Sequence, residues 1–180
     1  MKNFLKIADG VDVVPLQVAL AAKPFLWNEH TLRTSHPGSA HFEADDIWLR
    51  FNRLDEDKTK VVNDIICFDY PAMLHLPQAR TLVYQLMARV EGEQLGRAII
   101  TRLRPGERIT PHEDQGAPAT WYERFHIAIH SLPGAIFRAG DETVQMKTGE
   151  VWWFDNTVEH EVINNGADDR ITLIVDIRKT

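Results

Sequence analysis

Residues 123–138 have the sequence ERFHIAIHSLPGAIFR, in which two strand-forming runs flank a Pro-Gly turn. In the first run, three apolar side chains alternate with Arg124, His126 and an alanine. This period of two indicates a strand with one apolar face, and it places Arg124 and His126 together on the other face. That second face looks either into solvent or into a barrel. In a barrel, an arginine and a histidine would indicate a binding pocket rather than a core.

Similar strand-forming runs, separated by turn residues, continue through the C-terminal half of the chain. They comprise residues 97–104, 123–130, 135–138, 143–147, 151–154, 161–163 and 171–177. Many short strands at fairly even spacing are typical of an antiparallel sandwich or barrel. The pattern therefore predicts a mainly β domain.

The N-terminal half mixes helix and strand. Residues 15–22 predict a short helix. From Pro77 onward, apolar side chains recur at helical spacing, which predicts a second helix that packs on a sheet and ends near Gly92. Residues 46–51 and 60–68 predict two further strands. With helices confined to this half, we expect a jelly roll with N-terminal supporting helices.

The composition excludes several classes of protein. The 180 residues, 44% of them hydrophobic, suit a single domain, residues 1–180. The net charge is −6, and the scattered Lys and Arg residues argue against nucleic acid as a partner. No run approaches the ~18 apolar residues that a membrane span needs. The single cysteine, Cys67, cannot form an internal disulfide. We therefore expect a soluble, cytoplasmic protein, whose oligomeric state the sequence does not indicate.

Three side chains in the C-terminal half have the chemistry of a metal site. His112 and Asp114 lie two positions apart, so on an extended segment they project to the same side. His160 follows the strand predicted over residues 151–154, and distant strands can lie side by side in a jelly roll. Two imidazoles and one carboxylate leave three octahedral positions open, as in the facial triad of non-haem iron(II) oxygenases. A His-x-Asp sequence is also common by chance, and His160 alone equally suits a surface residue.

Arg170 adds weight to this interpretation. A cosubstrate such as 2-oxoglutarate has a distal carboxylate, which a planar guanidinium binds with two hydrogen bonds. Arg170 stands at the polar start of the apolar run over residues 171–175. The alternative for Arg170 alone is a solvent-exposed side chain at a strand end.

Taken in order, these motifs resemble the aspartyl/asparaginyl β-hydroxylase family, which also contains bacterial proline hydroxylases. The resemblance covers residues 97–178 and is carried by LRPG at 103–106, PHED at 111–114, RFH at 124–126, GEV at 149–151, FD at 154–155, HEV at 160–162 and RITLIVD at 170–176. The ordered set is specific, although each piece alone is weak. The resemblance implies a double-stranded β-helix that uses iron(II), 2-oxoglutarate and O2.

The resemblance also implies a role for each of several residues. His112 and His160 would be iron ligands, Arg170 would bind the distal carboxylate of 2-oxoglutarate with help from Thr101, and Arg124 and His126 would approach its iron-bound end. Asp114 occupies the place at which family members differ. Proline hydroxylases keep a carboxylate there and the animal β-hydroxylase does not, so the iron site looks nearer to that of the amino-acid hydroxylases.

The implied reaction hydroxylates an unactivated C–H bond while 2-oxoglutarate and dioxygen become succinate and carbon dioxide. The substrate is a small molecule or peptide: an amino acid, a peptide side chain or a small acid. Arg50, Arg102 and Arg138 are candidate substrate contacts, and each also suits a structural ion pair. In this scheme residues 1–95 form a support and substrate-side region, and residues 96–180 form the core that binds metal and 2-oxoglutarate.

Two other kinds of protein stay open. A non-catalytic β-sandwich that binds a ligand or a protein explains the strands, but it does not explain the joint placement of the triad residues and Arg170. A cupin-like zinc or manganese enzyme keeps the metal but leaves Arg124 and Arg170 without a role.

Overall fold

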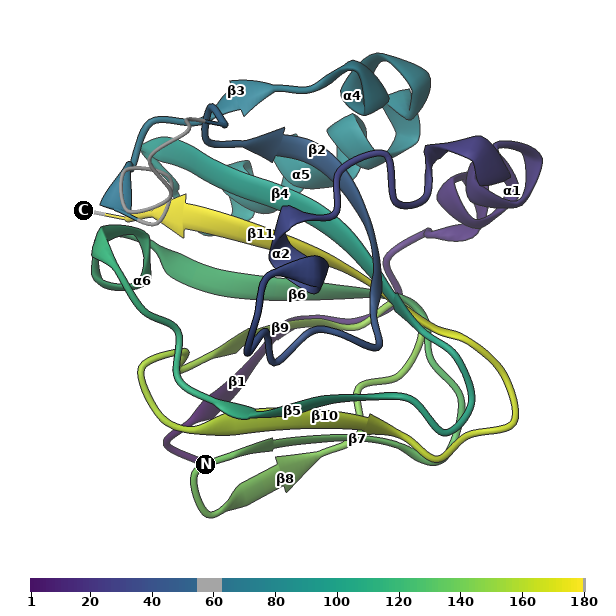
Figure 1. Cartoon of the computed structure of the whole chain (residues 1–180), viewed down its shortest axis with the longest axis vertical. Helices are drawn as coiled ribbons and strands as arrows, with labels where there is room; N and C mark the ends of the chain where they lie inside the picture. The colour runs from purple at the N-terminus through teal and green to yellow at the C-terminus, as the bar shows by residue number, and fades with distance from the viewer. Residues whose placement is uncertain (55–62, 180) are drawn as a thin grey trace.

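The computed structural model describes residues 1–54 and 63–179 (Figure 1). The strands of this part of the chain are β1 (Phe4–Ala8), β2 (Asp45–Phe51), β3 (Phe68–Asp69), β4 (Gln94–Leu103), β5 (Arg108–His112), β6 (Glu123–His130), β7 (Ala135–Ala139), β8 (Glu142–Val144), β9 (Val151–Phe154), β10 (His160–Asn164) and β11 (Arg170–Arg178). Its helices are α1 (Val14–Ala22), the 3-10 turn η1 (Pro24–Leu26), α2 (Leu32–Ser35), α4 (Pro71–His75), α5 (Pro77–Arg89) and α6 (Ala117–Trp121).

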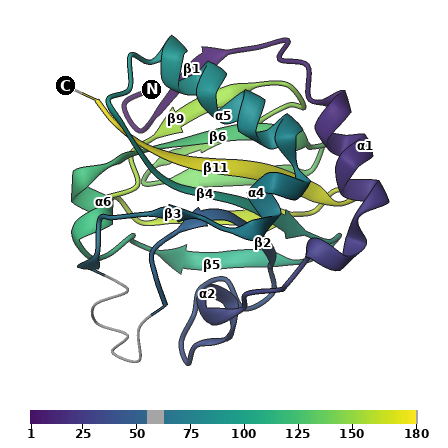
Figure 2. The ribbon, with the colours of Figure 1, turned by 90° about the horizontal axis from the view of Figure 1, so that it is seen from above.

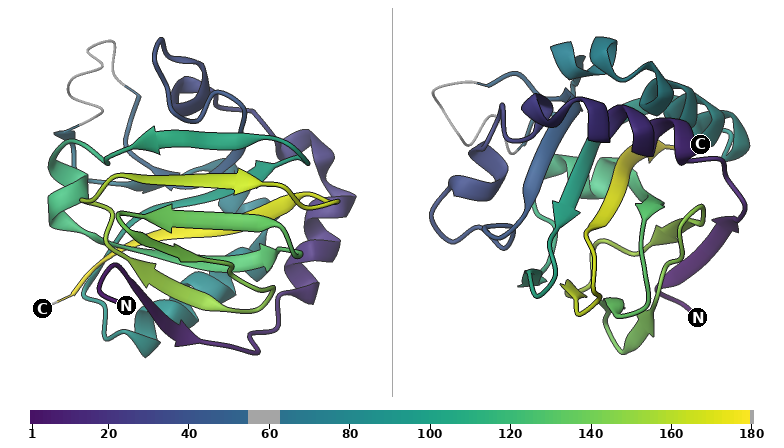
Figure 3. Two further views of the ribbon diagram at one scale, coloured as in Figure 1. Left: turned by 90° about the horizontal axis from the view of Figure 1, so that it is seen from below. Right: turned by 90° about the vertical axis from the view of Figure 1, so that its right-hand side faces the viewer.

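Two antiparallel sheets face each other. The larger sheet contains seven strands in the order β1-β9-β6-β11-β4-β2-β3, and the smaller contains four in the order β5-β10-β7-β8. Figure 3 shows α1 and α5 on one side of the larger sheet and the smaller sheet on the other. This arrangement confirms the predicted mainly β jelly roll with supporting helices.

The outer face of the larger sheet packs against α1 and α5 (Figure 2). Apolar side chains of β6 and β11 point to this side, and they share one buried cluster with the helices. Helix α5 buries Ala79, Leu82, Val83 and Leu86, so the predicted helical stripe is confirmed. The alternation in β6 is confirmed as well, because its other face, with Arg124 and His126, looks into the space between the sheets.

Several sequence-based boundaries need correction. Helix α5 ends at Arg89, and Glu91 rather than Gly92 takes the left-handed conformation, with φ of 55°. Gly92 is instead required by packing, because a Cβ there would collide with Cγ2 of Ile177. Of the strand predicted over residues 60–68, residues 60–62 lie outside the described residues, and residues 63–67 are not strand.

Other differences concern short elements. Strand β8 ends at Val144, so the strand predicted over residues 143–147 is too long. Helix α6 lies in the C-terminal half, so helices are not confined to the first half. Strand β1 was not predicted and pairs with β9. In the described part of the chain, no helix has the length and hydrophobicity needed to cross a bilayer.

The interior between the sheets is divided into two parts. A buried apolar cluster that includes Phe4, Phe137, Phe154 and Val162 fills much of it. Most of the remaining inner positions of β4, β6 and β11 carry polar and charged side chains, with Ile99 and Ile174 among them. The open end beside them is covered by the segment that contains α2 (Figure 1). The candidate site lies there.

Candidate metal and cosubstrate site

The three predicted metal ligands converge. Strands β5 and β10 are antiparallel neighbours, and His112 and His160 are direct partners in their register. Asp114 follows two residues after the end of β5, and its Oδ1 lies 3.9 Å from Nε2 of His112. One ligand atom from each of the three residues lies within 4.8 Å of the others. This spacing suits three ligands on one face of a single ion.

Both imidazoles are oriented by the backbone. Nδ1 of His112 lies 2.8 Å from the carbonyl oxygen of Thr110, and Nδ1 of His160 lies 2.9 Å from that of Val158. A carbonyl oxygen only accepts, so each Nδ1 donates and the lone pair stays on Nε2. This is the usual outer-sphere support of a metal-binding histidine, and it fixes both tautomer and ring direction.

The electrostatics favour the protonation states that bind a cation. Burial lowers the pKa of His112, and it lowers the pKa of His160 to about 4. Burial alone would raise the pKa of Asp114, but the Arg124 guanidinium and the neighbouring histidines outweigh it and hold that pKa below its ordinary value. Two neutral imidazoles and a carboxylate therefore coexist at neutral pH, as divalent metal binding requires.

Asp114 is held in place by its own partners. Arg124 donates from Nη1 to Oδ2 of Asp114, and Asn156 donates from Nδ2 to the same oxygen at 3.2 Å. Arg124 is anchored in turn by Asp176, at 2.8 Å from Nε and 3.0 Å from Nη2. Oδ2 is thus occupied, and Oδ1 faces the histidines. These contacts give Arg124 a positioning role, and its predicted approach to the cosubstrate stays a prediction.

Deeper between the sheets, three polar groups have no protein partner. Arg170 is only 4% exposed and makes no side-chain hydrogen bond or ion pair with the described residues; burial lowers its pKa to about 10. Oγ1 of Thr172 and Nδ1 of His126 are buried and also unpartnered. Such groups are costly when unsatisfied and are rare without a reason. A bound carboxylate is a ligand that would satisfy a cation and a hydroxyl together.

These polar groups share one face. Arg170, Thr172 and Ile174 alternate along β11, and Ile174 is the register partner of His126 on β6. A small cavity beside the metal ligands is lined by His126 and Ile174. The donor set suits 2-oxoglutarate, because the triad would bind an ion together with the keto-acid end and Arg170 would bind the far carboxylate.

Thr101 lies at the expected place with a different partner. It sits opposite Thr172 in the pairing of β4 with β11, but its hydroxyl donates to Oδ1 of Asp46 at 2.8 Å. Thr172, which the sequence analysis missed, has the unpartnered hydroxyl. The alternation of Arg170, Thr172 and Asp176 with apolar residues is the signal that would have found it, because all three share the inner face.

The three arginines predicted to contact substrate do not line either cavity beside the triad. Arg50 pairs with Asp69 at 2.7 Å. Arg102 binds Asp45 with Nε and Nη2 and lies over the ring of Trp27. Arg138 pairs with Glu161 at 2.6 Å and with Glu159 at 2.9 Å on the smaller sheet. Each guanidinium meets acids on its own sheet surface, and a substrate contact by these three arginines stays a prediction.

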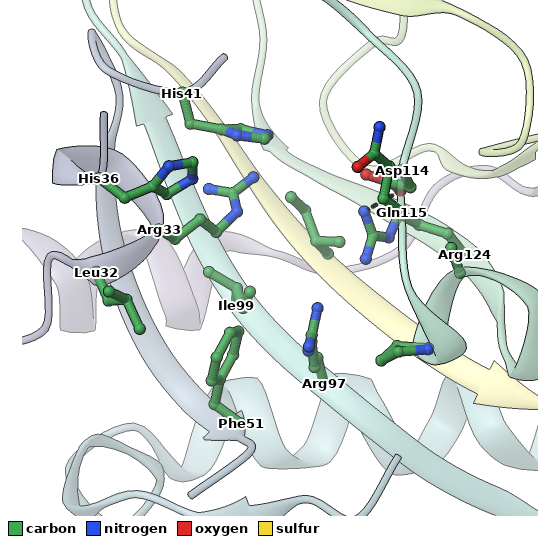
Figure 4. A pocket seen from close by; sticks show the side chains of 13 residues that line it. Leu32, Arg33, His36, His41, Phe51, Arg97, Ile99, Asp114, Gln115 and Arg124 are labelled. Atoms are coloured by element: carbon green, nitrogen blue, oxygen red, sulfur yellow. Dashed lines mark hydrogen bonds and ion pairs between the residues drawn. The ribbon is translucent and has the colours of Figure 1, made fainter. Parts of the chain in front are cut away.

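A second cavity, of about 180 Å³, adjoins the first and opens beside Asp114 (Figure 4). Its walls include Arg33 and His41 from the segment that covers the open end, Arg97 from β4, and residues of α6. The ring of His41 lies 4.7 Å from that of His112. The sequence analysis missed Arg33, His41, Arg97 and Asn156, because all four reach the site through long-range packing rather than through a local motif.

Comparisons with known proteins agree with this geometry. The family model for aspartyl/asparaginyl beta-hydroxylase matches residues 25–180. A search of the curated proteins by sequence finds no match. Among solved structures, a 2OG-Fe(II) oxygenase family protein from Burkholderia pseudomallei has a TM-score of 0.63 at 12% identity, with 98% of this chain and 85% of that chain covered.

Two further structures share the fold. The 2-oxoglutarate complex of a viral collagen prolyl hydroxylase from Paramecium Bursaria Chlorella virus-1 has a TM-score of 0.55 at 12% identity, over 99% of this chain and 97% of that chain. The non-heme alpha ketoglutarate dependent epimerase SnoN from nogalamycin biosynthesis has a TM-score of 0.65 at 11% identity, over 99% and 78%. At such low identity these structures support the fold alone.

The family match extends over most of the chain and includes every residue of the triad. The predicted enzyme class, a 2-oxoglutarate-dependent dioxygenase that uses iron(II), is confirmed by this family match, and the grouping of the three triad residues suits the metal. The chain belongs to the aspartyl/asparaginyl beta-hydroxylase family.

Proposed function

We propose that this chain hydroxylates an unactivated C–H bond of an amino acid, a peptide side chain or a small acid, with His112, Asp114 and His160 as iron(II) ligands. Arg170 and Thr172 bind the distal carboxylate of 2-oxoglutarate, and His126 lies toward its keto-acid end. The observation that supports this most is the pairing of a preorganised His-Asp-His group with an unpartnered, buried arginine.

Iron(II) and 2-oxoglutarate would supply the oxidising chemistry when bound: 2-oxoglutarate and dioxygen become succinate and carbon dioxide, and one oxygen atom enters the substrate as a hydroxyl group. The chain contributes placement. The Thr110 and Val158 carbonyls hold the two imidazoles, while Arg124 and Asn156 hold the carboxylate. Phe137 and Phe154 pack around His126, with its ring 5.2 Å and 4.9 Å from theirs, and keep bulk water from that side.

A bound carboxylate would pair with Arg170, which explains why the fold keeps a buried guanidinium without a protein partner. A guanidinium that is already buried binds a carboxylate far more strongly than one in water, because water does not compete for its hydrogen bonds. The strand supplies rigidity, since β11 is bonded on both sides, to β4 and to β6. We assign the substrate to the cavity beside Asp114. The substrate-side role of residues 1–95 and a cytoplasmic location stay predictions.

The test measures succinate formation from 2-oxoglutarate together with iron(II) binding. His112→Ala and His160→Ala are each expected to lose iron binding and reduce succinate formation to background, because two ligands cannot hold the ion on one face. His130→Ala is the matched control, since His130 pairs with Asp168 at the surface and lines neither cavity. Full succinate formation by both triad variants would reject the assignment.

A further inference from the structure

The cavity beyond the triad has a cationic wall. Arg33 from α2 and Arg97 from β4 extend into the same hollow from different elements, with Arg124 at its far side (Figure 4). Among the described residues that line it, Asp114 is the single acidic one, and Arg124 already binds it. The wall therefore presents positive charge that the triad itself does not use.

Asp46 holds Arg33 through one nitrogen, and the other two nitrogens keep their donors available. Nη1 of Arg33 lies 2.9 Å and 2.8 Å from the two oxygens of Asp46, which is itself buried. The Thr101 hydroxyl also donates to Asp46, so this carboxylate is held from two sides. Nε and Nη2 of Arg33 make no hydrogen bond with the described residues. A guanidinium anchored at one nitrogen and open at the others is preorganised for a carboxylate.

Arg97 is also held rigidly. Its Nε and Nη2 lie 2.8 Å and 2.5 Å from Oδ1 of Asn52, and its guanidinium stacks 4.5 Å from the centre of the Phe51 ring. Asn52 is fully buried, so the bond that orients Arg97 is shielded from solvent. The side chain loses little entropy when an anion binds, because it is already ordered.

The cavity is small, and apolar side chains form part of its wall beside His36, His41 and Gln115. Leu32, Phe51, Ile99 and Ile174 contribute apolar wall, and Ile174 also lines the inner cavity beside the triad. A volume of about 180 Å³ lies below the range of roughly 300–1,000 Å³ that drug-sized ligands occupy. A molecule of amino-acid size fits this space, with its aliphatic part toward Ile174 and the metal ligands.

We propose, on the basis of the function proposed above, that this cavity selects a small aliphatic carboxylate as the substrate to be hydroxylated. Arg33 and Arg97 bind the carboxylate, and the apolar wall directs an aliphatic carbon of the same molecule toward the triad. Arg124 is excluded from this role because Asp114 and Asp176 occupy its donors.

The first experiment compares acids with their amides on the wild-type protein loaded with iron(II). The probes are aliphatic amino acids and aliphatic monocarboxylic acids, each with its primary carboxamide, and the readouts are succinate formation and the gain of one oxygen atom by the probe. At least one acid is expected to be hydroxylated, with its amide about 30-fold or more poorer in kcat/KM, because the amide offers no negative charge to the two guanidinium groups.

The second experiment changes the arginine. Arg33→Gln is expected to raise the KM for the accepted acid at least about tenfold with a smaller change in kcat, and Arg33→Lys is expected to recover part of that loss. Arg80→Gln is the matched control, because Arg80 is an exposed arginine on α5, away from both cavities. Thermal melting of each variant checks the fold, and the acid-to-amide comparison needs no variant.

The outcomes separate the two proposals. Equal use of acid and amide, or better use of long peptides than of free acids, would overturn the substrate assignment. If no acid is hydroxylated while substrate-free succinate formation still depends on His160, the substrate assignment fails and the oxygenase function stands. If the wild-type protein forms no succinate with iron(II) and 2-oxoglutarate, both fail.

Discussion

The two faces of strand β11 differ in the kind of side chain that they bury. Ile171, Leu173 and Val175 point outward to the helices, where every group is apolar and packed. Arg170 and Thr172 alternate with them and point inward, where a buried cation and a buried hydroxyl have no protein partner. The same nine residues therefore serve as ordinary core on one side and as binding surface on the other.

This contrast distinguishes the residues that stabilise the folded state from those that bind ligands. Outer-face residues lower the free energy of the folded state through burial of apolar area. On the inner face, Arg170 and Thr172 raise it, because desolvated polar groups without partners cost free energy. Substitutions on the two faces should thus have opposite effects on unfolding and on ligand binding, and each can be measured.

Among substitutions on β11, the largest effect on turnover is expected from Arg170→Met. Loss of the guanidinium should raise the KM for 2-oxoglutarate about 30-fold or more, since a buried carboxylate loses its charged partner. The same change should increase the free energy of unfolding of the ligand-free protein by about 1–3 kcal/mol, because it removes an unsatisfied buried group. Steady-state kinetics and urea unfolding test both signs. An unchanged KM, or a less stable variant, would contradict the distinction between the two faces.

Asp176→Asn should have an intermediate effect. It keeps the shape of the side chain but removes the charge that anchors Arg124, so Asp114 loses its fixed position beside the histidines. Metal affinity is expected to fall about 10- to 100-fold, as measured by an anaerobic iron(II) titration. Asp69→Asn is the matched control, because Asp69 pairs with Arg50 outside the site. Equal affinities in the two variants would show that the anchor does not act on the metal ligands.

The smallest effect on turnover is expected from Leu173→Ala on the outer face. Leu173 is fully buried in the cluster beneath the helices, and its truncation should lower the free energy of unfolding by about 2–5 kcal/mol. Below the melting transition, kcat and KM should stay within about twofold of wild type, because the inner face is unchanged. A large rise in the KM for 2-oxoglutarate would show that the two faces are coupled.

The sequence predicts the strands well because alternation is a local property. The inner placement of Arg124 and His126 follows from period two in one strand, and the triad follows from a short motif plus one distant histidine. The partners of those residues do not follow. Whether Arg124 contacts a cosubstrate or two carboxylates depends on which strands lie beside β6, and no local pattern encodes that.

The substrate side was harder to predict for the same reason. A charge inside an apolar strand indicates a functional residue, which favours Arg50, Arg102 and Arg138, but each pairs with an acid on its own sheet surface. Arg33 lies in a four-residue helix with no motif around it. It reaches the site only because the segment between α1 and β2 folds over the open end of the barrel (Figure 1).

The direct pairing of His112 with His160 has a mechanical consequence. Strand β5 is the edge of the smaller sheet, and it is joined to β10 through a register that shifts near these two residues. An ion bound by His112 and His160 would link β5 to β10, so metal binding and the pairing of these two strands would be thermodynamically coupled. A shift of the β5 register by one residue would turn the His112 imidazole away from the ion. Metal binding would therefore favour the native register of this edge strand.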